Sequence, residues 1–367
     1  MHYHIVLTTE CNLTCRYCYE KSVRDSDSYS DEPFSFDFSA PSRSEVDVHN
    51  LKAFLEKDEN PVLIFYGGEP LLEIEKMKEI IDAIDVPFRM QTNGLLLDNL
   101  PQKYVNRIQK ILVSLDGDRK RTDHNRGKGV YNRIMRNISL IKNSYKGEII
   151  ARMTVAQDCP DIDRQVISLY KDGFSFIHWQ LDAGFYTFDF DEEKVTTFVK
   201  EYNRRISNLV DYWIQKMEKG TVLTLYPFVG IVSSLLKKEN TQLRCGAGHA
   251  GYCITTNGSI VACPITTHIK DFSAGTLDTA PQDLKKFEVS GRCLLCKIRN
   301  VCGGRCLYWN KAHLWPNQGD DLICETVRHL VRKLESVVPV IEQLIQKGVV
   351  QQSDFEYEKY FGPEIIP

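Results

Sequence analysis

Short apolar runs alternate with amphipathic stretches along the first half of the chain. Each apolar run has the length of a buried strand, and apolar residues at helical spacing fill most of the stretches between the runs. The predicted strands cover residues 2–9, 61–66, 86–91, 110–115, 148–156 and 174–181. Repeated strand–helix units predict an α/β fold with a parallel sheet, which right-handed crossovers would curl into a partial (β/α)6 barrel of the TIM-like kind.

The amphipathic stretches predict the helices. They cover residues 44–57, 71–84, 130–143, 161–171, 191–220 and 325–347. Residues 191–220 keep apolar side chains at helical spacing over their whole length, which indicates core packing. We expect this helix to close the barrel.

Polar motifs follow directly after four of the predicted strands. They occupy residues 11–18, 67–70, 92–94 and 114–117. Because sites in such barrels are built at the carboxyl ends of the strands, we expect these motifs to face one cavity. Asp182 ends the sixth strand in the same way, so it either faces a substrate or serves as a structural acid of the loop.

Three cysteines, Cys11, Cys15 and Cys18, stand within eight residues after the first strand. Three thiolates this close can hold one metal centre, but a tetrahedral or cubane centre takes four ligands. The site therefore either borrows a distant fourth residue or leaves one position open for a small molecule. A zinc knuckle or a chance cluster is the alternative.

The composition of the chain indicates in which compartment the expected metal site operates and how the cysteines are used. The chain has 367 residues and a net charge of 46 − 49 = −3, which argues against non-specific binding to nucleic acid. We find no apolar run of the roughly 18 residues that cross a bilayer and no signal-like N-terminal segment, so we expect a cytoplasmic protein. Twelve cysteines at short spacings then suggest metal rather than disulfides.

Eight of the remaining nine cysteines gather near the C-terminus. Their spacings are C-x7-C-x9-C and then C-x2-C-x5-C-x3-C-x17-C, formed by Cys245, Cys253, Cys263, Cys293, Cys296, Cys302, Cys306 and Cys324. Eight thiolates suit two sites of four ligands, either iron–sulfur clusters or zinc. We expect a barrel at residues 1–220, a bridging segment at 221–244, a cysteine-rich domain at 245–324 and a C-terminal helix and tail at 325–367.

The N-terminal C-x3-C-x2-C spacing, with Tyr17 before the last cysteine, resembles the signature of radical S-adenosylmethionine (radical SAM) enzymes. The resemblance implies that the three thiolates bind a 4Fe-4S cluster whose open iron chelates SAM. It further implies that Gly67, Gly68 and Glu69 meet the SAM amine, Ser114 the ribose and Arg126 the carboxylate. The expected cofactor-binding residues are therefore Tyr17, Gly67, Gly68, Glu69, Thr92, Asn93, Ser114 and Arg126. A surface charge is the alternative for Arg126.

The C-terminal array resembles the SPASM extension of this family, which carries two auxiliary 4Fe-4S clusters. By that likeness, one cluster takes Cys245, Cys253, Cys263 and Cys306, and the other takes Cys293, Cys296, Cys302 and Cys324. Three clusters would use eleven cysteines and leave Cys159 as a spare thiol. The cofactors implied are three 4Fe-4S clusters and SAM.

SPASM relatives mostly modify peptides or protein side chains. The resemblance therefore implies hydrogen abstraction from a peptide or protein substrate, making a crosslink, thioether or epimer, with an electron donor such as flavodoxin or ferredoxin. Sulfatase-maturing relatives carry an aspartate base after the third array cysteine, where this chain has Pro264. We see no room for a leader-binding domain before Cys11 and expect a modifier of ribosomal peptides without one. The alternatives are an anaerobic sulfatase maturase and a non-catalytic iron–sulfur carrier or sensor.

Overall fold

The computed structural model describes residues 1–19, 34–182, 190–362 and 366–367, which adopt an α/β fold with a parallel sheet. They form two compact units, each assembled from three segments. Unit 1 comprises Met1–Leu115, Arg119–Ile150 and Gly246–Glu288. Unit 2 comprises Asp116–Asp118, Ala151–Cys245 and Val289–Pro367.

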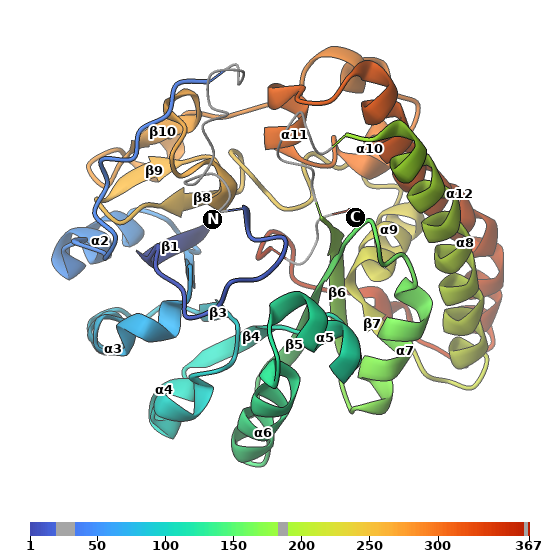
Figure 1. Cartoon of the computed structure of the whole chain (residues 1–367), viewed down its shortest axis with the longest axis horizontal. Coiled ribbons are helices and arrows are strands. Elements are labelled where there is room, and N and C mark those ends of the chain that lie inside the picture. Colours follow the sequence, from blue (N-terminus) through green and yellow to red (C-terminus); the bar gives the residue numbers. More distant parts are fainter. Residues whose placement is uncertain (20–33, 183–189, 363–365) are drawn as a thin grey trace. The chain divides into compact units, whose positions relative to one another are not determined.

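A sheet forms the centre of unit 1 (Figure 1). Its strands are β1 (His2–Thr8), β2 (Val62–Gly67), β3 (Phe88–Thr92), β4 (Ile108–Ser114), β8 (Gly251–Ile254), β9 (Ser259–Val261) and β10 (Ser273–Thr276). Neighbouring strands from β1 to β4 pair in parallel, and β8 adds to the free side of β1 in the same direction. Strands β9 and β10 follow as antiparallel neighbours, so the order is β10-β9-β8-β1-β2-β3-β4.

Helices cover the outer face of strands β1 to β4 (Figure 1). They are α2 (Val48–Leu55), α3 (Ile74–Ala83), α4 (Gln102–Val105) and α6 (Val130–Lys142), and α5 (Arg119–Arg126) precedes α6. Helix α3 shows why they pack there, since it buries Met77, Ile80 and Ile81 at helical spacing. Short 3₁₀ turns complete the unit: η2 (Pro70–Glu73), η3 (Leu97–Asn99), η5 (Pro264–Thr266), η6 (Lys270–Phe272) and η7 (Pro281–Asp283).

Unit 2 is mostly helical. Strand β5 (Glu148–Val155) starts in unit 1 and ends in unit 2, where β6 (Phe176–Leu181) and β7 (Thr224–Leu225) pair in parallel. The larger helices are α7 (Ile162–Lys171), α8 (Glu192–Met217), α9 (Tyr226–Lys237) and α12 (Asn317–Gln346). Short elements carry the C-terminal cysteines: η8 (Gly291–Leu295), α10 (Arg299–Cys302) and α11 (Leu307–Ala312), with η9 (Gln352–Phe355) after α12.

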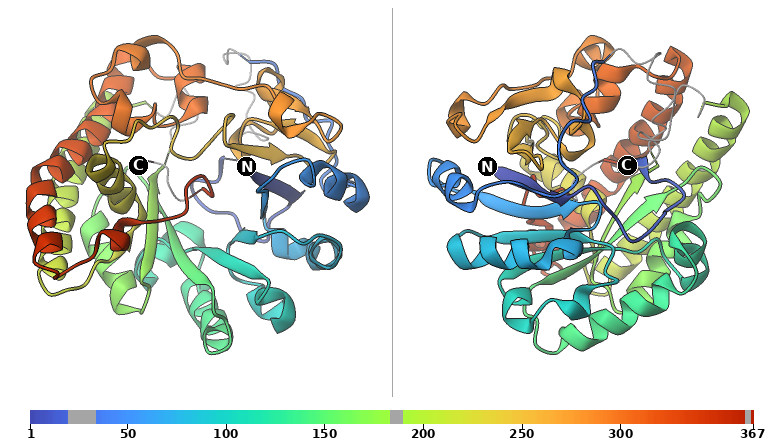
Figure 2. Two further views of the ribbon diagram at one scale, coloured as in Figure 1. Left: turned by 180° about the vertical axis from the view of Figure 1, so that it is seen from behind. Right: turned by 60° about the vertical axis from the view of Figure 1, so that its left-hand side comes forward.

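Helices α8 and α12 run side by side in unit 2 (Figure 2). Both bury an apolar stripe, which includes Trp213 on α8 and Leu330 on α12. Polar contacts join their flanks: the Lys333 Nζ lies 2.7 Å from Asp211, and the Ser207 hydroxyl lies 2.9 Å from the Nε2 of His329. The two helices therefore form one packed layer.

The predicted α/β fold with a parallel sheet is confirmed, and strands β1 to β6 lie where the apolar runs predicted them. Helices α4, α5 and α9 to α11 and strands β7 to β10 were not predicted, and helix α12 begins earlier than predicted. Residues 119–126 form helix α5, which lacks the apolar periodicity that would have predicted it. Helix α12 begins at Asn317 and not at residue 325, because its first two turns are largely polar. The predicted division of the chain into four parts stays a prediction. Among the described residues, no helix combines the length and the apolar composition that spanning a bilayer requires.

Candidate functional site

The cysteine loop of unit 1 leaves the carboxyl end of β1. The backbone N–H of Cys18 donates to the carbonyl of Cys15 (3.1 Å), and the N–H of Leu13 donates to the Sγ of Cys11 (3.4 Å). All three thiols of the predicted SAM cluster are partly exposed. The loop thus folds on itself and leaves its sulfur atoms reachable by a ligand.

Two glycines at the end of β2 hold the start of this loop. A Cβ on Gly67 would lie 2.2 Å from the carbonyl oxygen of Thr8, and one on Gly68 would lie 2.2 Å from that of Glu10. The N–H groups of Gly68 and Glu69 donate to those same two carbonyls, at 2.8 and 2.9 Å. The glycine pair is therefore required for strand-to-loop contact, whatever it also offers to a ligand.

Glu69 is a buried carboxylate behind the loop, with none of its surface exposed. It accepts hydrogen bonds from the Thr92 hydroxyl (2.6 Å), the Asn93 N–H (2.7 Å) and the Leu71 N–H (3.1 Å). Burial raises the pKa of Glu69 to about 7, and the three donors offset only part of that effect. The carboxylate joins the ends of β2 and β3.

Asn93 connects this network to the cysteines. Its Nδ2 donates to the Oδ1 of Asn12 (2.7 Å) and lies 3.8 Å from the Sγ of Cys11. Ser114, which was predicted to contact the SAM ribose, ends the neighbouring strand β4. The residue before it, Val113, is in register with Thr92 of β3. An amide donor beside a thiolate stabilises the ionised ligand form that a metal requires.

Arg126 lies against the same loop from helix α5. Its side chain is only 8% exposed, so it is not a surface charge. Its Cζ lies 5.4 Å from the centre of the Tyr17 ring, and its Nη1 lies 4.0 Å from the Sγ of Cys15. The Arg16 N–H donates to the Asn125 carbonyl (2.9 Å), which fastens α5 to the loop. A buried guanidinium next to an open thiol triad can pair with a ligand carboxylate.

Unit 1 therefore brings most of the predicted SAM contacts to the cysteine loop. The loop is surrounded by Gly67, Gly68, Glu69, Asn93 and Arg126, with Tyr17 within the loop itself and Thr92 held on Glu69. The sequence did not single out Asn12, whose only signal was its place beside Cys11. The roles of the predicted cofactor-binding residues toward SAM stay predictions.

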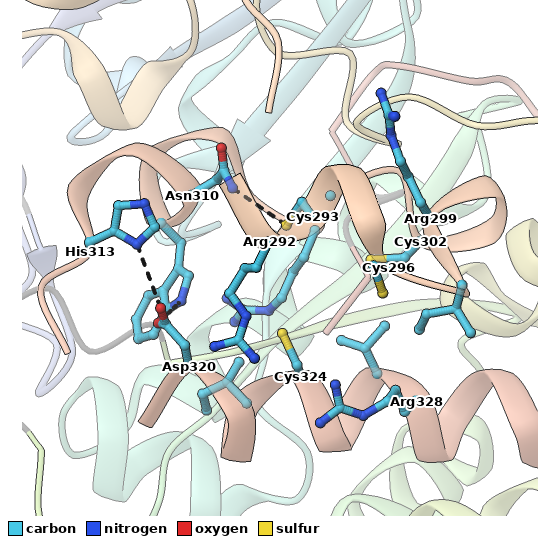
Figure 3. Close-up of a pocket in the computed structure, with 16 residues that line it drawn as sticks. Arg292, Cys293, Cys296, Arg299, Cys302, Asn310, His313, Asp320, Cys324 and Arg328 are labelled. Carbon is cyan, nitrogen blue, oxygen red and sulfur yellow. Dashed lines mark hydrogen bonds and ion pairs between the residues drawn. The ribbon is translucent and has the colours of Figure 1, made fainter. Parts of the chain in front are cut away.

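A second site lies wholly within unit 2. Cys293, Cys296, Cys302 and Cys324 line one pocket with a cavity of about 60 Å³. Figure 3 shows Cys324 pointing from α12 toward the segment that carries the other three thiols. These are the four cysteines expected to hold the second auxiliary cluster.

Local sequence explains how the segment 293–306 turns back on itself. Gly303 and Gly304 take φ values of +71° and +104°. A Cβ on Gly303 would lie 2.7 Å from the Leu243 nitrogen, and one on Gly304 would lie 2.4 Å from Val289. Only glycine combines these backbone angles with such close packing. The Nδ2 of Asn310 donates to the Sγ of Cys293 (3.4 Å), as a supporting group of a thiolate would (Figure 3).

Positive charge surrounds these thiols. The pocket is lined by one carboxylate, Asp320, and by Arg292, Arg299, Arg305 and Arg328. Burial raises the pKa of Cys302 to about 11 and also raises those of Cys293 and Cys324. These thiols therefore stay protonated unless a cation or a cluster takes the proton's place.

Arg305 has the most unusual surroundings. Its Nε and Nη1 are buried and find no hydrogen-bond partner among the described residues. The guanidinium lies over the Trp309 ring, 5.4 Å from its centre, and the Trp309 Nε1 donates to Asp320 (2.9 Å). A buried orphan cation is costly unless an anion accepts from it. A cluster held by four thiolates carries net negative charge and sulfur acceptors, so the residues present fit such a group.

Zinc is the other group with this ligand preference. Among the described residues, no three histidine, cysteine, aspartate or glutamate side chains converge closely enough to hold a single metal ion. The four thiols instead line a shared pocket.

The other predicted ligands are distributed between the units. Cys253 is buried in β8 beside Val6 and Val261, and Cys263 precedes η5 in unit 1. Cys245 and Cys306 belong to unit 2. A single cluster on these four thiols stays a prediction. So does the role of Asp182, whose N–H donates to the Val155 carbonyl (2.9 Å) directly after β6; residues 183–189 of its loop lie outside the described residues.

Comparison with known proteins identifies the class. Residues 5–158 match the radical SAM superfamily. These residues therefore form a radical SAM domain, a class of domain that implies a 4Fe-4S cluster and SAM.

Two curated relatives and one solved structure align with most of the chain. A cysteine-type anaerobic sulfatase-maturating enzyme of Clostridium perfringens (strain 13 / Type A) is 23% identical over 334 residues, covering 81% of this chain and 85% of that enzyme. The radical SAM cyclopropyl synthase TigE of Paramaledivibacter caminithermalis is 20% identical over 368 residues, covering 90% and 73%. The structure of native anSMEcpe with bound AdoMet superposes with a TM-score of 0.70 at 18% identity, covering 93% and 99%, which shows the shared fold.

Proposed function

We propose that this radical SAM enzyme carries three 4Fe-4S clusters and modifies a peptide or protein side chain by hydrogen abstraction. The observation that carries the proposal is the pocket of Cys293, Cys296, Cys302 and Cys324, because Cys324 follows Cys302 by 324 − 302 = 22 residues and yet lines the same cavity as the other three thiols. A radical SAM enzyme with an additional cluster site of this kind is what a SPASM peptide modifier requires.

The residues of unit 1 would position SAM for the first step. A bound 4Fe-4S cluster would supply the one electron needed to cleave SAM to methionine and a 5′-deoxyadenosyl radical. Arg126 would pair with the SAM carboxylate, and Glu69 would hold the ends of β2 and β3 in place behind the loop. We propose that the electron comes from a carrier such as flavodoxin or ferredoxin.

A peptide substrate is supported by the relatives. The sulfatase-maturating enzyme and the cyclopropyl synthase align with most of this chain, and one structure of similar fold is native anSMEcpe with bound AdoMet and Cp18Cys peptide. We propose that this chain also acts on a peptide, and that a ribosomally made precursor is its substrate.

The decisive experiment gives the anaerobically reconstituted enzyme SAM, a reductant and candidate peptides deuterated at single carbon positions. Deuterium should appear in 5′-deoxyadenosine while the peptide changes mass. Transfer of deuterium from a small metabolite but from no peptide would refute the peptide proposal and leave the radical SAM assignment intact.

Sulfatase maturation is the second candidate, and sequence similarity to the Clostridium perfringens enzyme favours it. Against it stands Pro264, which begins η5 where sulfatase-maturing relatives are expected to carry an aspartate base. We therefore expect no aldehyde in a sulfatase-derived peptide. A loss of about 18 Da from a cysteine peptide, or about 2 Da from a serine peptide, would reverse this preference.

A further inference from the structure

The segment 292–299 combines features that are rare on this protein. It reads Arg-Cys-Leu-Leu-Cys-Lys-Ile-Arg, with three cations and no acid, although the whole chain carries a net charge of −3. Two of its residues, Cys293 and Cys296, are thiols of the unit 2 pocket. The two leucines stand between them.

Those leucines are exposed. Leu294 is 47% exposed and Leu295 is 89% exposed, the highest value among the large apolar side chains of the described residues. A single exposed leucine is ordinary, but an adjacent pair bracketed by two pocket thiols marks a contact surface. We call Leu294, Leu295 and Lys297 the leucine–lysine surface.

Its positive charge is available to a partner. Arg292 pairs with Asp321, but Lys297 and Arg299 are exposed and make no ion pair within the described chain. Free cations around an apolar centre favour a partner with acidic groups around an apolar edge, and they accelerate its approach.

We propose that the leucine–lysine surface docks an acidic one-electron carrier protein, which delivers an electron to the cluster held by Cys293, Cys296, Cys302 and Cys324. The proposal rests on the proposed function, because it requires that cluster. One electron leaves the reduced carrier and lowers the oxidation state of the cluster by one, and no bond is made or broken.

A carrier fits this surface better than other occupants. Electron transfer needs only a brief encounter, and such complexes bury small interfaces with charged rims. The two leucines belong to the same short turn, η8, as the first pocket thiol, so a protein seated on them approaches the cluster directly. In a symmetric dimer through this surface, the leucine–lysine surface of the second copy would bring the same positive charge and be repelled.

The test measures the rate at which a reduced flavodoxin reduces the reconstituted holoenzyme, followed anaerobically by stopped flow. Lys297→Glu and Leu295→Ser should each lower the bimolecular rate by about tenfold, and the wild-type rate should fall as salt rises from about 0.05 M to about 0.5 M. Leu140→Ser is the matched control, since Leu140 is 56% exposed on α6 in unit 1 and should leave the rate unchanged.

Reduction by dithionite distinguishes the docking proposal from the proposed function on which it rests, because dithionite can reduce the cluster without docking to the leucine–lysine surface. All variants should keep full iron content and dithionite-driven reduction. Unchanged flavodoxin rates in both surface variants would overturn the proposal, as would a wild-type protein that dimerises through this surface while the variants stay monomeric. Missing iron in the wild-type pocket would instead overturn the proposed cluster.

Discussion

Asn93 donates a hydrogen bond of 2.7 Å from its Nδ2 to the Oδ1 of Asn12, the residue that follows Cys11. The contact joins the end of β3 to the beginning of the cysteine loop. Because Glu69 holds Asn93 from behind through its backbone N–H, the loop rests on a chain of buried hydrogen bonds. The geometry of the thiols thus depends on residues that touch no metal themselves.

Removing the three loop thiols should separate the SAM site from the pocket of unit 2. We expect the combined change Cys11→Ala, Cys15→Ala and Cys18→Ala to abolish reductive SAM cleavage while the C-terminal clusters remain, since the sites use different cysteines. The measurement is 5′-deoxyadenosine after dithionite reduction. Continued cleavage by the triple variant would show that SAM binds elsewhere.

Iron content tests the ligand sets. Three 4Fe-4S clusters give 3 × 4 = about 12 irons per chain. Replacing Cys293, Cys296, Cys302 and Cys324 with alanine should leave about eight. Anaerobic preparation that yields two zinc ions per chain in place of iron would instead establish the zinc alternative.

Glu69 should make stability depend on pH. Its folded-state pKa of about 7 lies above the ordinary value of 4.5 because the ionised form is buried. The contribution of protonated Glu69 to the free energy of unfolding is therefore fully present below about pH 4.5. It is lost as the pH rises through about 7, and amounts to roughly 3 kcal/mol in all.

Glu69→Gln keeps the shape without the charge, so its melting temperature should rise relative to wild type between pH 5 and pH 8. Parallel melting curves for the two proteins across this range would mean that Glu69 does not titrate there.

Arg305 should tune the cluster of unit 2. Its orphan N–H groups and its charge favour the reduced, more negative state, so Arg305→Gln should lower the reduction potential by on the order of tens of millivolts. Arg305→Lys keeps the charge and should recover part of the shift. Equal potentials in all three proteins, measured by EPR-monitored titration, would show that Arg305 only fills space.

Periodicity and cysteine spacing predicted a large part of this architecture. Strands β1 to β6 are visible as apolar runs, since each is buried along at least half of its length. The four thiols of the unit 2 pocket were grouped in advance by family resemblance alone.

Other features depend on contacts that no local pattern records. Helix α5 buries Asn125 and Arg126 through polar contacts with the cysteine loop, so it shows no apolar stripe. Glycines 67 and 68 are fixed by carbonyls nearly sixty residues earlier in the chain. The burial of Glu69 likewise arises only where β2 and β3 meet. Long-range packing determines helix α5, the need for the glycine pair and the burial of Glu69.

The position of Cys324 on α12 has a consequence for biosynthesis. Cys293, Cys296 and Cys302 emerge from the ribosome before the helix that supplies the fourth thiol, and α12 gains its packing layer against α8 only when most of its 30 residues have been made. The proposed cluster could therefore not gain its fourth ligand before α12 has been synthesised. Iron delivery to this pocket would then follow the synthesis of α12, and a cell short of iron would accumulate chains that contain α12 with this site unfilled.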